Sequence, residues 1–318
     1  MPRTRPISLW NLLPRTVFKS RTPLHRAARA LFGSPWLWVM RWTRLRRELR
    51  RLANADVAVV SFPKSGRTWL MVLLSRLFQV KYGLPDTATI GGDSLRAMNP
   101  AVPAVLFTHG RFVNDMRPPV GEASPYFRKK LIFLARHPAD TAVSYYYHVR
   151  YRVDPLKLEI KQLPDLSGVS LFEFMETASC GMPDIIEYLN AWAAALRQHP
   201  RHLLLRYEDL HADPKSQLCR ITEFIGESFE EAAYDEAIHF ASFEQLQKKE
   251  RENFFGSRRL QARDLDNPES FKIRRGKIGG YRNELNEKQI AWVEQQVNEK
   301  LDAVFGYSSN AGLHRKGS

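Results

Sequence analysis

Cysteine is scarce in this sequence, with Cys180 and Cys219 the two present among 318 residues. Two cysteines cannot build the disulfide framework of a small secreted domain or a cysteine-rich metal cluster. We therefore expect no metal site. The cysteine usage suits a reducing compartment, and we expect a cytoplasmic protein.

Acidic residues are nearly absent from the first 55 residues. This segment holds thirteen Lys or Arg and one acid, Glu48, whereas residues 56–318 hold 35 basic and 33 acidic residues. The formal net charge of +14 therefore belongs to an N-terminal arm, and the body is close to neutral. Because the body lacks an excess of basic residues, we do not expect nucleic acid as a partner.

A long apolar run is also missing from the arm. Its longest uncharged stretch, residues 30–40, is shorter than the ~20 apolar residues that span a bilayer, and no secretory signal is evident. Residues 36–52 mix apolar side chains with six arginines, a pattern typical of a basic amphipathic helix. Three interpretations stay open: a solvated extension whose helix packs on the body, peripheral attachment to an anionic membrane surface, or an organelle-targeting peptide.

The rest of the chain alternates short apolar segments with helical patterns. Strands are predicted at residues 56–61, 104–108, 131–135 and 202–206, and helices at 68–80, 139–150, 184–198, 214–225 and 287–304. Such alternation is typical of α/β proteins. We predict a single P-loop-like domain with a central parallel sheet flanked by helices, plus the basic N-terminal helical extension. The predicted boundaries are 1–55 for the arm, 56–305 for the domain and 306–318 for a tail.

The first strand is followed by a loop suited to binding an anion. Residues 62–69 read Phe-Pro-Lys-Ser-Gly-Arg-Thr-Trp and open a helix, whose first N–H groups are unpaired and favour negative charge. Lys64 adds a cation, Ser65 and Thr68 add hydroxyl donors, and Gly66 permits close approach of a ligand. The glycine pattern of the Walker A motif is absent, which argues against a nucleotide kinase or NTPase.

A second anion site is predicted where the third strand ends. Arg136 stands at the strand end, and a guanidinium can hold a phosphate through two parallel hydrogen bonds. Ser144 lies two helical turns further along and is placed to approach the same group.

Both segments resemble motifs of the cytosolic-type sulfotransferases that use 3′-phosphoadenosine 5′-phosphosulfate (PAPS). The family loop reads Tyr-Pro-Lys-Ser-Gly-Thr-Thr-Trp, which differs from residues 62–69 only at Phe62 and Arg67. The resemblance implies that the loop, Lys64, Ser65, Gly66, Arg67, Thr68 and Trp69, holds the 5′-phosphosulfate, with Trp69 on the adenine. The family motif Arg-Asn-Pro-Lys-Asp-Val-Ala-Val-Ser-Tyr-Tyr matches residues 136–146 in spacing. It implies that Arg136 and Ser144 bind the 3′-phosphate.

Three further segments follow the family order within residues 56–305. Tyr207, in Tyr-Glu-Asp, is implied to lie near the adenine, and Ser242 with Phe243 is implied to cover it. Residues 274–281 resemble Arg-Lys-Gly-x-x-Gly-Asp-Trp, although Gly and Tyr replace the last two residues. The resemblance implies that this segment closes over the 3′-phosphate through Arg274, Arg275 and Gly276.

Sulfuryl transfer needs in-line geometry, charge neutralisation on the leaving oxygen and a base for the acceptor proton. Lys64 is expected to act on the leaving phosphate oxygen. His109 is the candidate base, because it follows a strand and because Thr108-His109 resembles the family's Lys-Thr-His segment. His148 is the reserve candidate.

These features predict a metal-free sulfotransferase that converts PAPS to adenosine 3′,5′-bisphosphate (PAP). The acceptor is expected to be a hydroxyl or amine on a small molecule or lipid, bound by loops at residues 114–125, 151–182 and 244–268. The alternatives are a kinase-like enzyme, or a module that binds membrane or nucleic acid through the arm. The sequence indicates no oligomeric state.

Overall fold

The computed structural model describes residues 34–90, 94–110, 121, 124–154, 158, 163–177, 180–257, 260–274 and 276–307. The predicted tail beyond residue 307 and most of the predicted loop at 114–125 lie outside these residues, as does the arm before residue 34.

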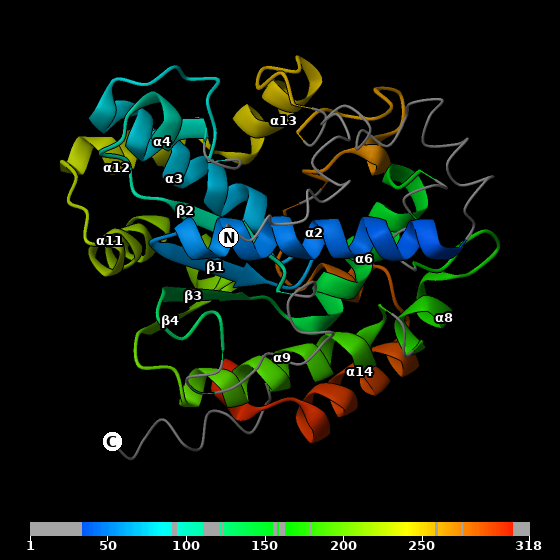
Figure 1. Cartoon of the computed structure of the whole chain (residues 1–318). Coiled ribbons are helices and arrows are strands. Elements are labelled where there is room, and N and C mark those ends of the chain that lie inside the picture. Colours follow the sequence, from blue (N-terminus) through cyan, green and yellow to red (C-terminus); the bar gives the residue numbers. More distant parts are fainter. Residues whose placement is uncertain are drawn as a thin grey trace.

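One parallel sheet forms the centre of the molecule, in the strand order β2-β1-β3-β4 (Figure 1). The strands are β1 Val57–Ser61, β2 Val105–Thr108, β3 Lys130–Ala135 and β4 His202–Arg206. All four predicted strands are confirmed, each within one residue of its expected bounds. The continuous burial of β1 follows from its apolar, β-branched sequence, which suits a strand covered on both faces.

Helices cover both faces of the sheet. They are α2 Ser34–Asn54, α3 Arg67–Tyr82, α4 Ser94–Met98, α6 Pro138–Arg152, α8 Leu171–Glu176, α9 Met182–Arg197, α10 Tyr207–Ala212, α11 Pro214–Ile225, α12 Glu231–Phe240, α13 Phe243–Arg251 and α14 Glu287–Lys300. Short 3₁₀ turns occupy η4 Pro268–Ser270, η5 Gly280–Asn283 and η6 Ala303–Phe305. The α/β fold predicted from the sequence is confirmed.

The helix predicted over residues 287–304 ends early, at Lys300. Asn190 of α9 takes over the main-chain groups that would continue it. Its amide nitrogen donates to the Lys300 carbonyl at 2.6 Å, and its amide oxygen accepts from the Asp302 N–H at 2.8 Å. A contact between distant segments therefore decides where this helix stops.

Alternate residues of β1 belong to two separate cores. Val57 and Val59 pack with α3, α11 and α12, whereas Ala58 and Val60 pack with α6, α9 and α14. This division is the two-residue period of a strand with both faces buried. It fixes the sheet as the middle layer, so that loops at the strand ends stay accessible.

The carboxyl ends of all four strands meet at one edge of the sheet. In the ladder Val60 lies beside Thr108, Ser61 beside Leu134, and Ala135 beside Arg206. Because β2 and β3 flank β1 on opposite sides, the chain changes direction at β1. Open α/β sheets bind their ligands in the crevice at such a point.

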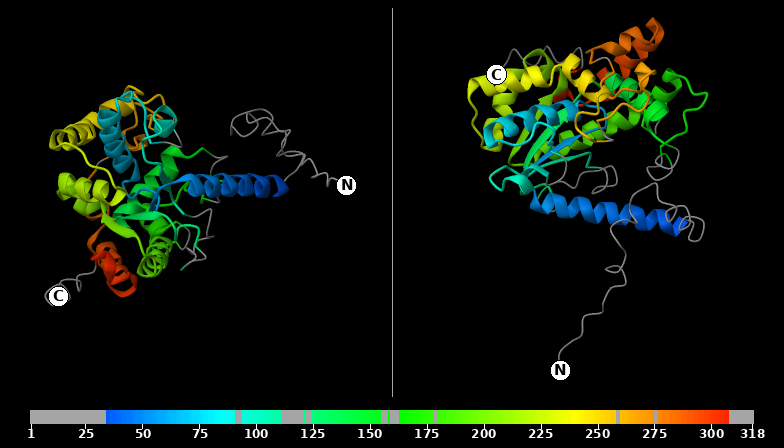
Figure 2. Two further views of the ribbon diagram at one scale, coloured as in Figure 1. Left: turned by 60° about the vertical axis from the view of Figure 1, so that its left-hand side comes forward. Right: turned by 90° about the horizontal axis from the view of Figure 1, so that it is seen from above.

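Helix α2 meets the body at its carboxyl end, and its amino half extends outward (Figure 2). Leu52 is 1% exposed in one of the cores, and Lys129 donates from Nζ to the Ala53 carbonyl at the helix end, 2.7 Å away. Its basic outward positions, Arg46, Arg47 and Arg50, are exposed.

Candidate active site

The loop after β1 has a backbone that few residues adopt. Lys64 has φ of 75° and Gly66 has φ of 91°, both in the left-handed region. A Cβ atom on Gly66 would lie 2.3 Å from Cδ2 of Tyr207, so only glycine fits beneath that ring. Helix α3 starts at the next residue, and its first N–H groups therefore face the carboxyl edge of the sheet, where an anion is favoured.

Lys64 lies half-buried among other positive charges. Burial, together with the nearby guanidinium groups of Arg152 and Arg136, lowers the pKa of its amine to about 7 against the opposing effect of Glu250. Several cations lie close together here beside the Glu250 carboxylate, and a bound anion would stabilise them. The surroundings of Lys64 thus fit a phosphate or sulfate group.

Arg136 joins this loop to the end of β3. Its Nη1 donates to the Lys64 carbonyl at 3.1 Å, and its Nη2 donates to the Lys277 carbonyl at 3.3 Å. The guanidinium carbon lies 4.4 Å from the centre of the Tyr207 ring. Among the residues that the structure describes, the buried Nε of Arg136 has no hydrogen-bond partner. Leaving a buried, charged N–H without an acceptor destabilises a protein, and a bound ligand could supply the acceptor.

Aromatic side chains gather beside the two cations. Trp69 donates from Nε1 to the Ala241 carbonyl at 2.9 Å, and its ring lies edge-on to Tyr207 with centroids 5.7 Å apart. Phe243 packs against Gly276, where an added Cβ would be 3.0 Å from the ring. Tyr207 in turn donates from its hydroxyl to the Gly276 carbonyl at 3.4 Å. Four segments predicted to contact the nucleotide are thus close together.

The other residues predicted to bind PAPS differ in burial and in their hydrogen-bond partners. Arg274 forms ion pairs with Glu269 at 3.0 Å and Glu284 at 3.1 Å, so its charge is already shared by two carboxylates. Ser144 is half-buried on α6, and the Ser242 hydroxyl accepts the Gln245 N–H as the cap of α13. Ser65 is 1% exposed, Thr68 is half-buried on the first turn of α3, and Arg67 begins that helix. Arg275 lies outside the described residues.

His109 follows β2 at the same edge of the sheet. Its Nδ1 lies 2.8 Å from the Ser61 carbonyl, and its own carbonyl accepts a 2.7 Å hydrogen bond from the Tyr188 hydroxyl. A carbonyl partner requires the proton on Nδ1, which leaves Nε2 as the basic nitrogen. His148, the reserve candidate, stacks on Tyr145 with centroids 6.2 Å apart.

The sequence did not identify several side chains that shape the site. Asp140 is 4% exposed and accepts from the Gly279 N–H at 2.7 Å and the Tyr281 N–H at 3.1 Å, which ties residues 279–281 to the start of α6. The Arg152–Glu250 pair is buried, and Glu250 accepts the N–H groups of the two residues that precede Arg274. Asp140 lies within the second phosphate motif, at residues 136–146, and its place in that motif could have identified it as a site residue.

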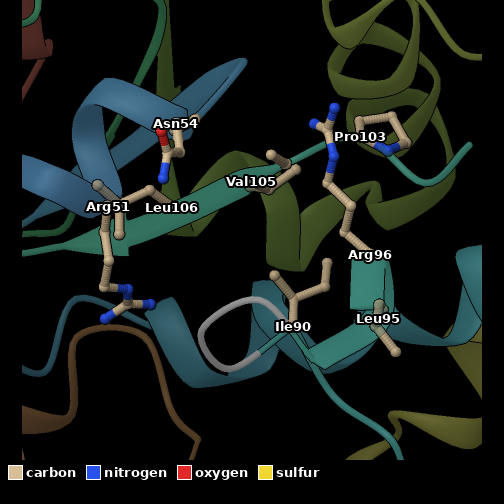
Figure 3. A pocket seen from close by; sticks show the side chains of 10 residues that line it. Arg51, Asn54, Ile90, Leu95, Arg96, Pro103, Val105 and Leu106 are labelled. Carbon is tan, nitrogen blue, oxygen red and sulfur yellow. The ribbon is translucent and has the colours of Figure 1, made fainter. Parts of the chain in front are cut away.

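A small cavity at the edge of the sheet is separate from these groups (Figure 3). It is lined by residues that include Arg51, Arg96 and Val105. Val105 begins β2, whereas His109 follows its other end. The cavity therefore lies at the amino end of this strand and does not belong to the phosphate loops.

No group of three or more His, Cys, Asp or Glu side chains in the described part of the chain could hold a metal ion. No described helix is long and apolar enough to cross a membrane.

Comparison with known proteins places this arrangement in a family. The family model described as a sulfotransferase domain matches residues 124–305, more than half of the chain. Flavonol 3-sulfotransferase of Flaveria bidentis is 27% identical over 268 residues, covering 78% of this chain and 82% of the relative. Sulfotransferase 1B1 of Mus musculus is 26% identical over 296 residues, covering 86% and 89%.

A solved structure has the same fold. The crystal structure of mouse sulfotransferase SULT7A1 complexed with PAP matches with a TM-score of 0.54 and 18% identity, covering 86% of this chain and 94% of that one. Together with the family model, these likenesses establish the resemblance first seen in the phosphate motifs. The chain belongs to the sulfotransferase family, and it is a PAPS-dependent transferase.

Proposed function

We propose that the carboxyl edge of the sheet binds PAPS and that the chain transfers its sulfuryl group to an acceptor hydroxyl or amine. The observation that carries this proposal is the junction of Lys64 and Arg136, two cations from separate strand-end loops. The buried Nε of Arg136 and the lowered pKa of Lys64 both favour an anionic ligand there. PAPS supplies the activated sulfate and a 3′-phosphate.

The predicted binding residues form two groups, one for the 5′-phosphosulfate of PAPS and one for its 3′-phosphate and adenine. The loop at residues 64–69 is proposed to hold the 5′-phosphosulfate, with Lys64 stabilising charge on the leaving phosphate oxygen. Arg136 and Ser144, together with the segment from Arg274 to Gly276, are proposed to hold the 3′-phosphate. Trp69, Tyr207, Ser242 and Phe243 would surround the adenine.

His109 is proposed to take the proton of the acceptor. Its basic Nε2 belongs to a ring that is fixed through Nδ1, which is the tautomer that a general base needs. The acceptor oxygen or nitrogen then attacks sulfur in line with the departing PAP. One S–O bond to phosphate breaks as the new bond to sulfur forms.

Mass spectrometry tests this reaction directly. The purified chain is incubated with PAPS and a panel of small phenols, including a flavonol, because one relative bears that substrate in its name. We expect formation of a sulfated acceptor and PAP in equal amounts, and loss of both in Lys64→Ala. PAP release without any sulfated acceptor would contradict transfer to the acceptors tested.

We also propose a cytoplasmic location with peripheral membrane attachment through the arm, residues 1–55, and a lipid or amphiphilic acceptor. Support comes from the exposed arginines on the outer face of α2, at positions 46, 47 and 50. Vesicles with and without anionic lipid test it. We expect anionic vesicles to bind the full chain, and binding to fall when the three arginines are replaced by Gln. Binding that stays unchanged without residues 1–55 would contradict the proposal.

A further inference from the structure

Glu48, the one acid in the arm, reaches from α2 to the end of β2. The Thr108 hydroxyl donates a hydrogen bond to Oε1 of Glu48, and the same hydroxyl accepts the Gly110 N–H at 3.0 Å. Thr108 thus connects the arm helix to the turn that carries His109. No sequence motif indicated a role for Glu48.

The turn around His109 is tightly defined. Gly110 has φ of 69°, and a Cβ at that position would lie 2.8 Å from the Trp192 ring. The Thr108 hydroxyl fixes the Gly110 N–H, while Ser61 and Tyr188 contact the His109 ring and carbonyl. The imidazole is held directly by the Ser61 carbonyl, and the Thr108 hydroxyl holds the main chain of the turn on which the imidazole stands.

The environment of Glu48 connects it with the phosphate loop as well. Burial raises the pKa of its carboxyl group, while the Thr108 hydroxyl and the charges of Arg51 and Arg67 lower it. Arg67 is the first residue of α3 and belongs to the phosphate loop at residues 64–69. Glu48 consequently interacts with Thr108, next to the predicted base, and with one residue of the predicted donor site.

The packing of α2 holds Glu48 in this place. Leu52, one helical turn further along, is buried in the core, and Lys129 binds the carbonyl of Ala53. The neighbouring Arg46, Arg47 and Arg50 point to solvent. The carboxyl group is therefore on the inner side of a helix whose end is anchored.

We propose that Glu48 is a positioning residue for His109, acting through Thr108 on the turn at residues 108–110. The inference rests on the proposed role of His109 as the base. Removal of the carboxyl group frees the Thr108 hydroxyl to rotate, which loosens the turn and misaligns Nε2. Misalignment lowers the rate of proton transfer and leaves donor binding intact.

Steady-state kinetics on the full chain tests this inference. We expect Glu48→Ala to lower kcat about tenfold to hundredfold, with the affinity for PAP kept within about twofold. Glu48→Gln keeps an oxygen that accepts the Thr108 hydroxyl and is expected to restore most of kcat. Glu236→Ala is the matched control, because it removes a carboxylate that pairs with Arg76 on α3 away from the site. We expect it to leave kcat unchanged.

Double variants separate this inference from the proposed function. If His109 is the base and Glu48 acts through it, Glu48→Ala adds no further loss in a His109→Ala background. Full activity of His109→Ala would contradict the base assignment itself. A dead His109→Ala combined with a normal kcat in Glu48→Ala would overturn the positioning role alone.

Thr108→Val removes the donor of the Thr108–Glu48 hydrogen bond, and it replaces Glu48→Ala as the test variant if Glu48→Ala fails to fold. Its kcat is expected to fall at least as far, because valine also removes the acceptor of the Gly110 N–H, and Thr108→Ser is expected to rescue it. A folded Thr108→Val protein with normal kcat would equally overturn the proposal.

Discussion

Nη1 of Arg136 donates a 3.1 Å hydrogen bond to the main-chain carbonyl oxygen of Lys64. This contact joins the loop after β1 to the loop after β3, although 72 residues separate the two along the chain. The two cationic residues are thereby held together at one edge of the sheet, through a main-chain carbonyl and not through a carboxylate. Two neighbouring cations favour a bound anion at this edge.

Arg136→Lys keeps the positive charge and removes the planar guanidinium. A lysine ammonium lacks the planar fork that reaches the Lys64 and Lys277 carbonyls and a phosphate together, so we expect at least about tenfold weaker binding of PAP. Binding of 5′-AMP should change little. Isothermal titration calorimetry checks both ligands, with Arg220→Lys on the exposed face of α11 as the control. Equal weakening of PAP and AMP would contradict a role at the 3′-phosphate.

Lys64 is expected to take up a proton when PAP binds. Its pKa is lowered to about 7, so at pH 8 most of the amine is neutral, and a bound anion raises that pKa and recharges it. Affinity for PAP should therefore fall as the pH rises above 7. Calorimetry in buffers of different ionisation enthalpy measures the uptake. Lys64→Arg, which stays charged, should show none, and an equal heat in all buffers for the natural sequence would contradict this account.

His109→Gln is expected to lower kcat by about 10²- to 10⁴-fold, the usual contribution of a general base. PAP affinity should stay within about twofold, because the ring is not placed among the donor-binding groups. His202→Gln, at the exposed amino end of β4, provides the matched control. The measurement is the initial rate of PAP formation with saturating acceptor. A residual rate near that of the natural sequence would remove His109 from the mechanism.

Gly66→Ala is expected to disrupt the phosphate loop. The new Cβ meets Tyr207 at 2.3 Å with φ at +91°, so the free energy of unfolding should fall by at least about 2 kcal/mol. Gly83→Ala has a similar φ of +62° but nothing within 4 Å, and should cost only about 1 kcal/mol. Urea unfolding measures both. Equal losses would show that the contact with Tyr207 has no energetic effect.

Much of the fold could be predicted from the sequence because its signals are local. The strands are short apolar runs and the longer helices have an apolar periodicity, and all four strands were predicted. Short helices such as α10 and α12, with six and ten residues, were not predicted, since fewer than three turns leave little periodicity. The early end of α14 depends on Asn190, which no local pattern reveals.

The candidate site was predicted in part for a similar reason. Phosphate motifs lie within single strand-loop-helix units, so Lys64 and Arg136 could be identified from their neighbours. The contacts of Asp140 with residues 279–281 and of Glu48 with Thr108 join segments far apart in the chain. Their partners follow from tertiary packing, which spacing along the sequence does not encode.

The most direct test is a calorimetric titration of the chain, without added metal, with PAP and with 5′-AMP. The account predicts tight binding of PAP and at least about tenfold weaker binding of AMP, because Arg136 is proposed to bind the 3′-phosphate that AMP lacks. Equal affinity for the two nucleotides in folded protein would contradict the proposed donor site.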